Sequence, residues 1–433
     1  MTPAMLRDLM WALPFAGLLL SIAIFPLWKP HAWEKYYPYV SILLGLSVVL
    51  HYIFGLKQTE ILLETGQEYL SFIILIGSLF VVSGGIFLQT RGEATPARNC
   101  IFLFVASCFA NLLGTTGASM VFIRPWIRMN KYRFTGFHLV FFIFLVSNIA
   151  GGLTPIGDPP LFLGYLKGVP FFWVLFHVWP MWLIAMAYLL VLFFVIDTIN
   201  FRKAPRAIRD LETAHDQTFK FRGKRNILYL AMILGSVFIN HPPFLREGLM
   251  LIAAALSLWT TPRDVHEAND FNFKPIREVA ILFLGIFATM IPALEWLEHY
   301  ARELGIQRPG QFFWLSGALS SVLDNAPTYL NFLSLQCGLF MGEAATHMRL
   351  DSLPAESVVP WILSFHPVFL TAISVSTVFF GAMTYIGNGP NFLVKSIAEH
   401  AKVKTPGFFG YLVRYGLPIL LPLFVVLWWL FFR

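Results

Sequence analysis

Two segments of the chain combine helix-breaking residues with polar side chains inside long apolar runs. Residues 154–163 read T-P-I-G-D-P-P-L-F-L, and residues 384–393 read T-Y-I-G-N-G-P-N-F-L. Pro has no amide donor and its ring clashes with the preceding turn, so each helix is expected to break here. Broken helices can bind coupling ions through exposed carbonyls and anionic groups through exposed amides. We therefore predict substrate- or ion-binding residues at both breaks: Ser147, Asn148, Thr154, Gly157 and Asp158 at the first, and Thr384, Gly387 and Asn388 at the second.

Two further apolar runs, residues 99–123 and 312–335, have polar centres. These are either kinked helices or re-entrant hairpins that enter and leave the membrane on one side, and we predict hairpins. Their tips offer hydroxyl, amide and carboxylate oxygens of the kind that alkali cations accept. The candidate residues are Thr115, Thr116, Gly117 and Ser119 at the first tip, and Asp324, Asn325 and Thr328 at the second.

Asp158 and Asp324 are the acidic residues that this interpretation puts deep in the membrane. A buried carboxylate there is expensive unless it is paired, ion-bound or protonated. One group that can hold either H⁺ or Na⁺ has the chemistry of an antiporter, and we predict a Na⁺ site formed by Asp158, Asp324 and Asn325. The alternative is that each aspartate caps a helix. Asp197 and Glu295 lie near predicted span ends and are expected to face water.

These residues must be positioned by membrane-spanning helices. Ten runs are long and apolar enough to cross a bilayer. We place them near residues 11–27, 39–56, 70–89, 134–167, 171–198, 226–241, 245–260, 278–297, 360–398 and 408–432. The runs at 134–167 and 360–398 contain the two breaks. The predicted fold is an all-α polytopic membrane protein with about ten transmembrane helices and two re-entrant hairpins.

The composition supports this fold class and excludes others. Of 433 residues, 57% are hydrophobic and only 13% are charged, which fits neither a soluble nor a disordered chain. The net charge of +7 comes from basic residues in short loops, so we predict contact with the lipid bilayer and no nucleic-acid partner. No nucleotide-binding P-loop, zinc motif or nucleophile with a nearby base is present, so we expect neither an enzyme nor a cofactor beyond coupling ions.

The chain also divides into two similar halves, residues 1–198 and 226–433, joined by a basic linker at 199–225. Each half has three spans, a hairpin, an interrupted span and a final span. Six of ten positions agree between the two break segments, at a constant offset. Five spans per half imply an inverted repeat, which is typical of secondary transporters. Treating both tips as re-entrant gives the clearest excess of Lys and Arg on one side, with the linker cytoplasmic and both termini outside.

The break and tip motifs together resemble those of a known group. S-N-I-A-G-G-L-T-P-I-G-D-P-P, at 147–160, resembles the broken-helix motif of the ion transporter superfamily. That group includes Na⁺/H⁺ antiporters of the NhaD type, citrate carriers of the CitMHS type, arsenite permeases and Na⁺-coupled dicarboxylate carriers. L-D-N-A-P-T, at 323–328, resembles the hairpin tip of the antiporter and arsenite branches.

The resemblance implies a dimeric scaffold, a transport domain that moves as an elevator, and two Na⁺ sites in a bacterial inner-membrane protein. One site would use the first tip with residues 156–158, and the other the second tip with residues 386–388. The dicarboxylate carriers have Ser-Asn-Thr at both tips, whereas this chain has Thr115-Thr116-Gly117 and Asp324-Asn325-Ala326. We therefore rank Na⁺/H⁺ antiport first, Na⁺- or H⁺-coupled citrate or carboxylate transport second and arsenite efflux third.

Overall fold

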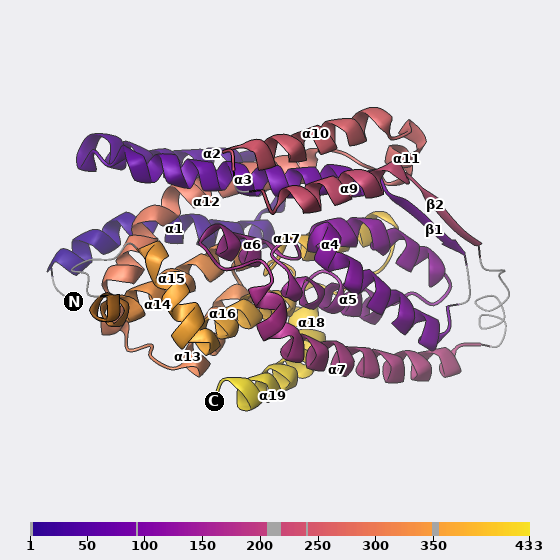
Figure 1. Ribbon diagram of the computed structural model, residues 1–433. Helices are drawn as coiled ribbons and strands as arrows, with labels where there is room; N and C mark the ends of the chain where they lie inside the picture. Colours follow the sequence, from indigo (N-terminus) through magenta and orange to yellow (C-terminus); the bar gives the residue numbers. More distant parts are fainter. Residues whose placement is uncertain (1–2, 92–93, 206–217, 240, 349–354) are drawn as a thin grey trace.

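The computed structural model describes residues 3–91, 94–205, 218–239, 241–348 and 355–433, and most of them are helical (Figure 1). Eight helices in this part of the chain are long and apolar enough to cross a membrane, or nine if one sharply bent pair counts as a span. The prediction of an all-α polytopic membrane protein is confirmed.

One group of helices packs along the upper side of the molecule in Figure 1. Helix α12 lies against α1 and α2, and α10 lies against α3 and α9. Helix α2 continues into a π-helix, η1, before the chain turns back into α3. The members are α1 (Pro3–Trp28), α2 (Pro30–Leu50), η1 (His51–Leu56), α3 (Thr59–Gly84), α9 (Arg225–Ser236), α10 (Leu245–Thr260), α11 (Arg263–Ala268) and α12 (Lys274–His299).

A small antiparallel ribbon lies at one end of this group. Strand β1 (Phe87–Arg91) pairs with β2 (Thr218–Arg222), so that Phe87 lies opposite Arg222. The predicted span at 70–89 was therefore placed too far along the chain, because its helix runs from Thr59 to Gly84. The predicted linker contributes the second strand of the ribbon. Its T-F-K-F-R segment alternates Phe with Lys or Arg and carries residues that favour strands, which explains the pairing.

Both predicted hairpins fold back on themselves. Within α4 (Pro96–Met129) only Gly114 leaves the helical conformation. The two arms lie side by side, since Asn99 donates a hydrogen bond to Asn130 at 2.9 Å and the rings of Phe102 and Trp126 stack at 5.5 Å. The second hairpin consists of α13 (Pro309–Ser320) and α14 (Asn325–Met348), whose second arm is longer than predicted.

Both predicted helix breaks are also present. The first lies between α5 (Gly136–Leu145) and α6 (Pro159–Leu166), with a 3₁₀ turn, η2 (Ile149–Leu153), between them. The second lies between α16 (Pro367–Phe380) and α17 (Gly389–His400), with η4 (Gly381–Met383) between them. The region predicted as one span at 360–398 also bends by 100° between α15 (Ala355–Phe365) and α16. His366 precedes Pro367 at this bend, and a residue before Pro avoids the helical conformation.

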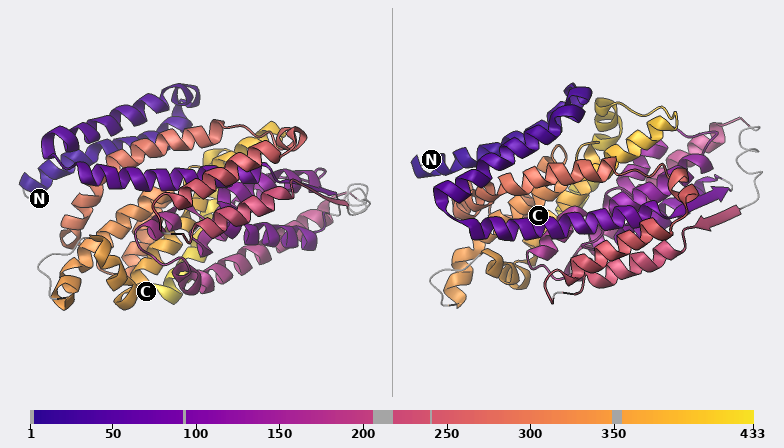
Figure 2. Two further views of the ribbon diagram at one scale, coloured as in Figure 1. Left: turned by 45° about the horizontal axis from the view of Figure 1, so that its top comes forward. Right: turned by 90° about the horizontal axis from the view of Figure 1, so that it is seen from above.

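The remaining helices complete the lower side of the molecule (Figures 1 and 2). Both termini lie away from the β1–β2 ribbon in these views. Each half contains a hairpin followed by a broken helix, and the inverted relationship between the halves stays a prediction. The remaining elements are α7 (Trp173–Lys203), η3 (Ala301–Leu304), α18 (Phe408–Tyr411), η5 (Leu412–Leu420) and α19 (Leu421–Phe431).

Candidate functional site

Both hairpin tips and both helix breaks meet at the carboxylate of Asp158, which is 1% exposed. The Thr115 hydroxyl of the first tip donates to Oδ1 at 2.8 Å. The Asn388 amide of the second break donates to the same oxygen at 3.1 Å. The Asn325 amide of the second tip donates to Oδ2 at 2.5 Å. Four segments that are distant in sequence therefore share one buried charge.

The first tip also joins the first break through the backbone. The Thr115 amide donates to the Gly157 carbonyl at 2.8 Å. Gly114 has a φ of 73°, and a Cβ atom there would lie 3.2 Å from the Ile156 carbonyl oxygen. Glycine fits this position because it adopts positive φ without strain and allows the close approach.

The two breaks have the same local structure. The Thr154 hydroxyl donates to the Asn111 carbonyl at 2.8 Å and accepts from the Gly157 amide at 3.0 Å. The Thr384 hydroxyl donates to the Ser321 carbonyl at 2.6 Å and accepts from the Gly387 amide at 3.1 Å. Each threonine thus fastens a break to the hairpin beside it. The shared geometry supports the predicted repeat.

A chain of asparagines joins the two breaks. The Asn148 amide donates to Asn391 Oδ1 at 2.6 Å, and the Asn388 amide donates to Asn148 Oδ1 at 3.3 Å. Asn391 in turn donates to the Gly381 carbonyl at 2.8 Å. All three side chains are buried. Asn391 was not among the predicted residues, although its place in the N-G-P-N sequence of the second break could have indicated it.

Asp324 lies at the second tip but makes no hydrogen bond to this cluster within the described part of the chain. Its Oδ1 accepts from the Ala326 amide at 3.1 Å, and its carbonyl accepts from the Thr328 hydroxyl at 2.9 Å. It therefore caps α14, as the alternative interpretation of the sequence had it.

The other predicted residues surround this cluster without touching the Asp158 carboxylate. The hydroxyl oxygens of Ser119 and Ser147 lie 2.8 Å apart, one on the first hairpin and one at the end of α5. Thr116 and Gly117 line a small cavity beside the first tip. The resemblance implied two separate ion sites, whereas the structure brings residues of both sets to one carboxylate.

The cluster has the chemistry of a cation site. Its oxygens are the Asp158 carboxylate, the Thr115 hydroxyl, the Gly157 carbonyl and Asn325 Oδ1. The last of these is buried and has no hydrogen-bond partner among the described residues. No Lys, Arg or His in the described ranges donates to Asp158 either. A buried carboxylate without a basic partner calls for a proton or a bound cation, and hard oxygen ligands suit an alkali ion.

A comparison with protein families identifies the relatives of this chain. The family model CitMHS_2, described as "Putative citrate transport", matches residues 4–432. The chain belongs to the CitMHS family. No curated protein matches it. Family membership confirms the resemblance seen in the sequence and the broad class of membrane transporter.

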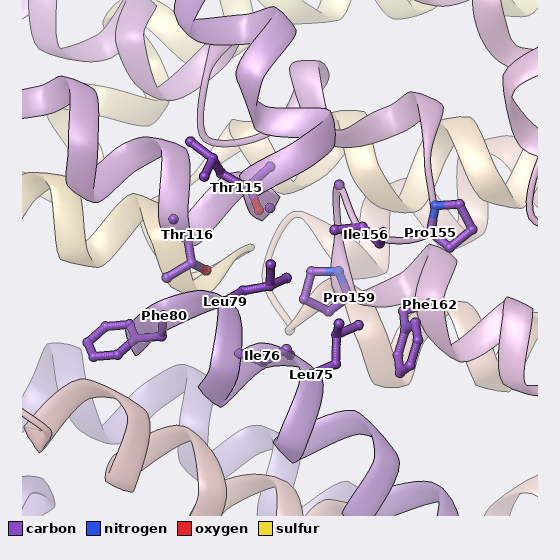
Figure 3. A pocket seen from close by; sticks show the side chains of 14 residues that line it. Leu75, Ile76, Leu79, Phe80, Thr115, Thr116, Pro155, Ile156, Pro159 and Phe162 are labelled. Atoms are coloured by element: carbon purple, nitrogen blue, oxygen red, sulfur yellow. The ribbon is translucent and has the colours of Figure 1, made fainter. Parts of the chain in front are cut away.

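The CitMHS chain has a cavity of about 30 Å³ next to the cluster (Figure 3). Helix α3 contributes Leu79 and Phe80, the first tip contributes Thr116, and the first break contributes Ile156 and Pro159. The cavity thus separates α3 from the tip and break that hold Asp158. Its lining is mostly apolar, with the threonine hydroxyls as polar groups.

A second buried charge in this CitMHS protein corrects one sequence prediction. Asp197 on α7 was expected to face water, but its side chain is fully buried. Arg133 pairs with both of its carboxylate oxygens, His138 Nε2 lies 3.2 Å from Oδ1, and Asn99 donates to Oδ2 at 2.8 Å. The prediction was wrong because Asp197 lies near the end of a long helix that the hairpin base covers. This pair holds the first hairpin to α7.

Proposed function

We propose that this protein is a secondary active transporter that couples the movement of a cargo to Na⁺ or H⁺ bound at Asp158. One observation carries the proposal: a fully buried carboxylate accepts three hydrogen bonds from neutral groups, and no basic residue in the described ranges donates to it. Such a charge is expensive in a membrane unless a mobile cation balances it. The coupling cation is the substrate of the site and not a resident cofactor.

The geometry suggests how binding and movement are linked. Thr115, Asn325 and Asn388 each bring a different segment to Asp158. A cation that binds the oxygens of several segments stabilises the arrangement in which those segments meet. A cation can shift a conformational equilibrium only by the difference between its affinities for the two conformations. Tips and breaks then move as one body, which is the elevator-type mechanism that the sequence resemblance implied.

Citrate, or a similar carboxylate, is the first candidate cargo, because the family description names citrate transport. The cavity of about 30 Å³ beside the first tip is much smaller than typical ligand pockets of about 300–1,000 Å³. Carboxylate entry therefore requires α3 to separate from Thr116 and the first break.

Na⁺/H⁺ antiport is the second candidate function. It is favoured by the surroundings of Asp158, where the described residues offer neutral donors and cation-binding oxygens but no positive side chain to attract a carboxylate. One carboxylate that exchanges H⁺ for Na⁺ would suffice for this activity. Arsenite efflux has no separate observation in its favour.

We further propose a homodimer in a bacterial inner membrane, with the 199–225 linker in the cytoplasm.

Reconstituted transport distinguishes these functions. Proteoliposomes with wild type or Asp158→Asn receive labelled citrate under an imposed Na⁺ or pH gradient, and proton flux is recorded after Na⁺ pulses without citrate. Gradient-driven citrate uptake in wild type supports the carboxylate carrier, whereas Na⁺-driven proton flux without citrate supports antiport. In either case folded Asp158→Asn should transport far more slowly than wild type at cation concentrations that just saturate wild type. An Asp158→Asn protein that transports like wild type would overturn the proposed site.

A further inference from the structure

A second and larger cavity lies between α1, η1 and α12, apart from the hairpin tips and the helix breaks. Its volume is about 560 Å³. No residue that lines it belongs to a tip or a break. The helix ends that line it, the start of α1 and the end of α12, lie on the left in Figure 1. The proposed transport function does not use it.

Aromatic rings form much of its wall. Trp11 stacks on His51 with the ring centroids 3.6 Å apart and the planes 8° apart. The rings of Trp296 and Tyr300 lie 5.6 Å apart, and Tyr52 also faces the cavity. Aromatic faces attract positively charged ammonium groups, and more strongly where water is excluded.

Two carboxylates complete the lining. The Tyr52 hydroxyl donates to Glu295 Oε2 at 2.7 Å, and the Tyr300 hydroxyl donates to Asp8 Oδ2 at 3.1 Å. These bonds hold the two carboxylates in place at the cavity. The combination of aromatic faces and carboxylates repels anions such as citrate. It also differs from a metal site, because the described residues contain no group of three His, Cys, Asp or Glu suited to a metal ion.

The backbone around His51 is adapted to this arrangement. The π-helix η1 begins at His51, and such turns frequently occur at functional sites. A Cβ atom on Gly55 would come within 2.8 Å of His51 Nδ1. The absence of a side chain at Gly55 therefore leaves room for the His51 ring, which in turn supports Trp11.

The cavity lies at the ends of three candidate membrane spans. Asp8 begins the candidate span Asp8–Pro26, while Leu56 and His299 end the candidate spans His31–Leu56 and Lys274–His299. At such ends we expect an apolar helix to meet the membrane surface. Trp and Tyr are typical of this zone.

We propose that this cavity binds an organic ammonium group, held over the rings of Trp11 and Trp296 and paired with Glu295. The group has two possible sources, an ethanolamine lipid headgroup of the bilayer and a free organic cation. Both share the chemistry that the site recognises, a positive nitrogen that fits an aromatic wall.

The first experiment measures binding of tetramethylammonium to the purified full-length protein through its tryptophan fluorescence. Wild type should bind saturably. Glu295→Gln, which retains the contact with Tyr52, and Trp11→Leu should each weaken binding by about tenfold. Glu399→Gln is the matched control, because Glu399 pairs with Lys395 on α17 outside the cavity and should bind as wild type does. Thermal melting checks that every variant is folded.

The second experiment distinguishes the two sources. Native mass spectrometry follows which lipid stays bound when the protein leaves nanodiscs of mixed phosphatidylethanolamine and phosphatidylglycerol. Retention of phosphatidylethanolamine that is lost in Glu295→Gln identifies the lipid headgroup, whereas tetramethylammonium binding without lipid retention identifies a free cation. Absence of both, or equal binding by wild type and both folded cavity variants, would overturn the proposal. Neither readout depends on transport.

Discussion

The Asn325 amide nitrogen lies 2.5 Å from Oδ2 of Asp158, although 167 residues separate them in the chain. Asn325 begins the second arm of the second hairpin, and Asp158 begins the second half of the first broken helix. One hydrogen bond therefore joins a tip from one half of the sequence to a break from the other. Any ion at Asp158 contacts structure from both halves, which makes this carboxylate the natural place to couple them.

Replacing Asp158 by Asn removes the charge and keeps the shape. We expect the apparent cation affinity in proteoliposomes to fall by about a hundredfold, equivalent to about 3 kcal/mol for a lost buried charge contact. Asp324→Asn is the informative comparison, because Asn caps a helix as well as Asp does. If that folded variant loses transport, transport requires the negative charge of Asp324. If it transports normally, Asp324 serves only to cap α14.

The two break threonines offer a test of the repeat. Thr154→Val removes a hydroxyl that makes two hydrogen bonds, and Thr384→Val removes one that makes three. Each should reduce stability by about 1–3 kcal/mol, because a buried carbonyl and a buried amide lose their partner. Thermal unfolding in detergent measures the effect. If one variant is strongly destabilised and the other behaves like wild type, the two breaks do not have equivalent roles.

Close backbone packing at the first break predicts sensitivity at Gly157. A Cβ atom there would overlap the Gly151 carbonyl oxygen, whereas a Cβ atom on Gly389 meets nothing within 4 Å. Gly157→Ala should therefore abolish transport or folding, and Gly389→Ala should be tolerated. Expression in membranes followed by the uptake assay tests both. Full activity of Gly157→Ala would show that the break can widen without loss of function.

The buried Arg133–Asp197 pair should make a large contribution to stability. Asp197→Asn leaves the Arg133 charge without its carboxylate, and such a change costs about 3–5 kcal/mol. Asp270→Asn is the control, since Asp270 pairs with Arg124 at 3.1 Å but its side chain is 80% exposed. An exposed pair contributes about 0–1 kcal/mol. We expect a much larger drop in melting temperature for Asp197→Asn, and equal drops would contradict the assigned role.

A double variant separates the effect of charge from the effect of packing at the Arg133–Asp197 pair. Arg133→Met combined with Asp197→Leu replaces the pair by apolar side chains of similar length. It should recover most of the stability lost in Asp197→Asn, because no unpaired charge is then buried. Melting temperatures of the single and double variants, measured in one detergent, provide the comparison.

The amino-acid sequence by itself determined the fold class, the hairpins and the breaks. Apolar runs indicate membrane-spanning helices, because backbone N–H and C=O groups in lipid can form hydrogen bonds only within their own helix. Gly157, Pro159 and Pro160 indicate a break, because two consecutive prolines lack amide donors and clash with a preceding helical turn, and Gly157 allows the chain to leave the helix. The family resemblance rested on these same residues, and the family match supports it.

Only the tertiary structure decided which polar residues meet. Asp158 and Asp324 look alike in the sequence, yet one collects three hydrogen bonds from distant segments and the other caps its own helix. Asp197 looked exposed and is buried against Arg133. Local sequence fixes backbone geometry, whereas burial and hydrogen-bond partners depend on packing between segments that lie 43 to 230 residues apart. That packing selects Asp158 as the centre of the site.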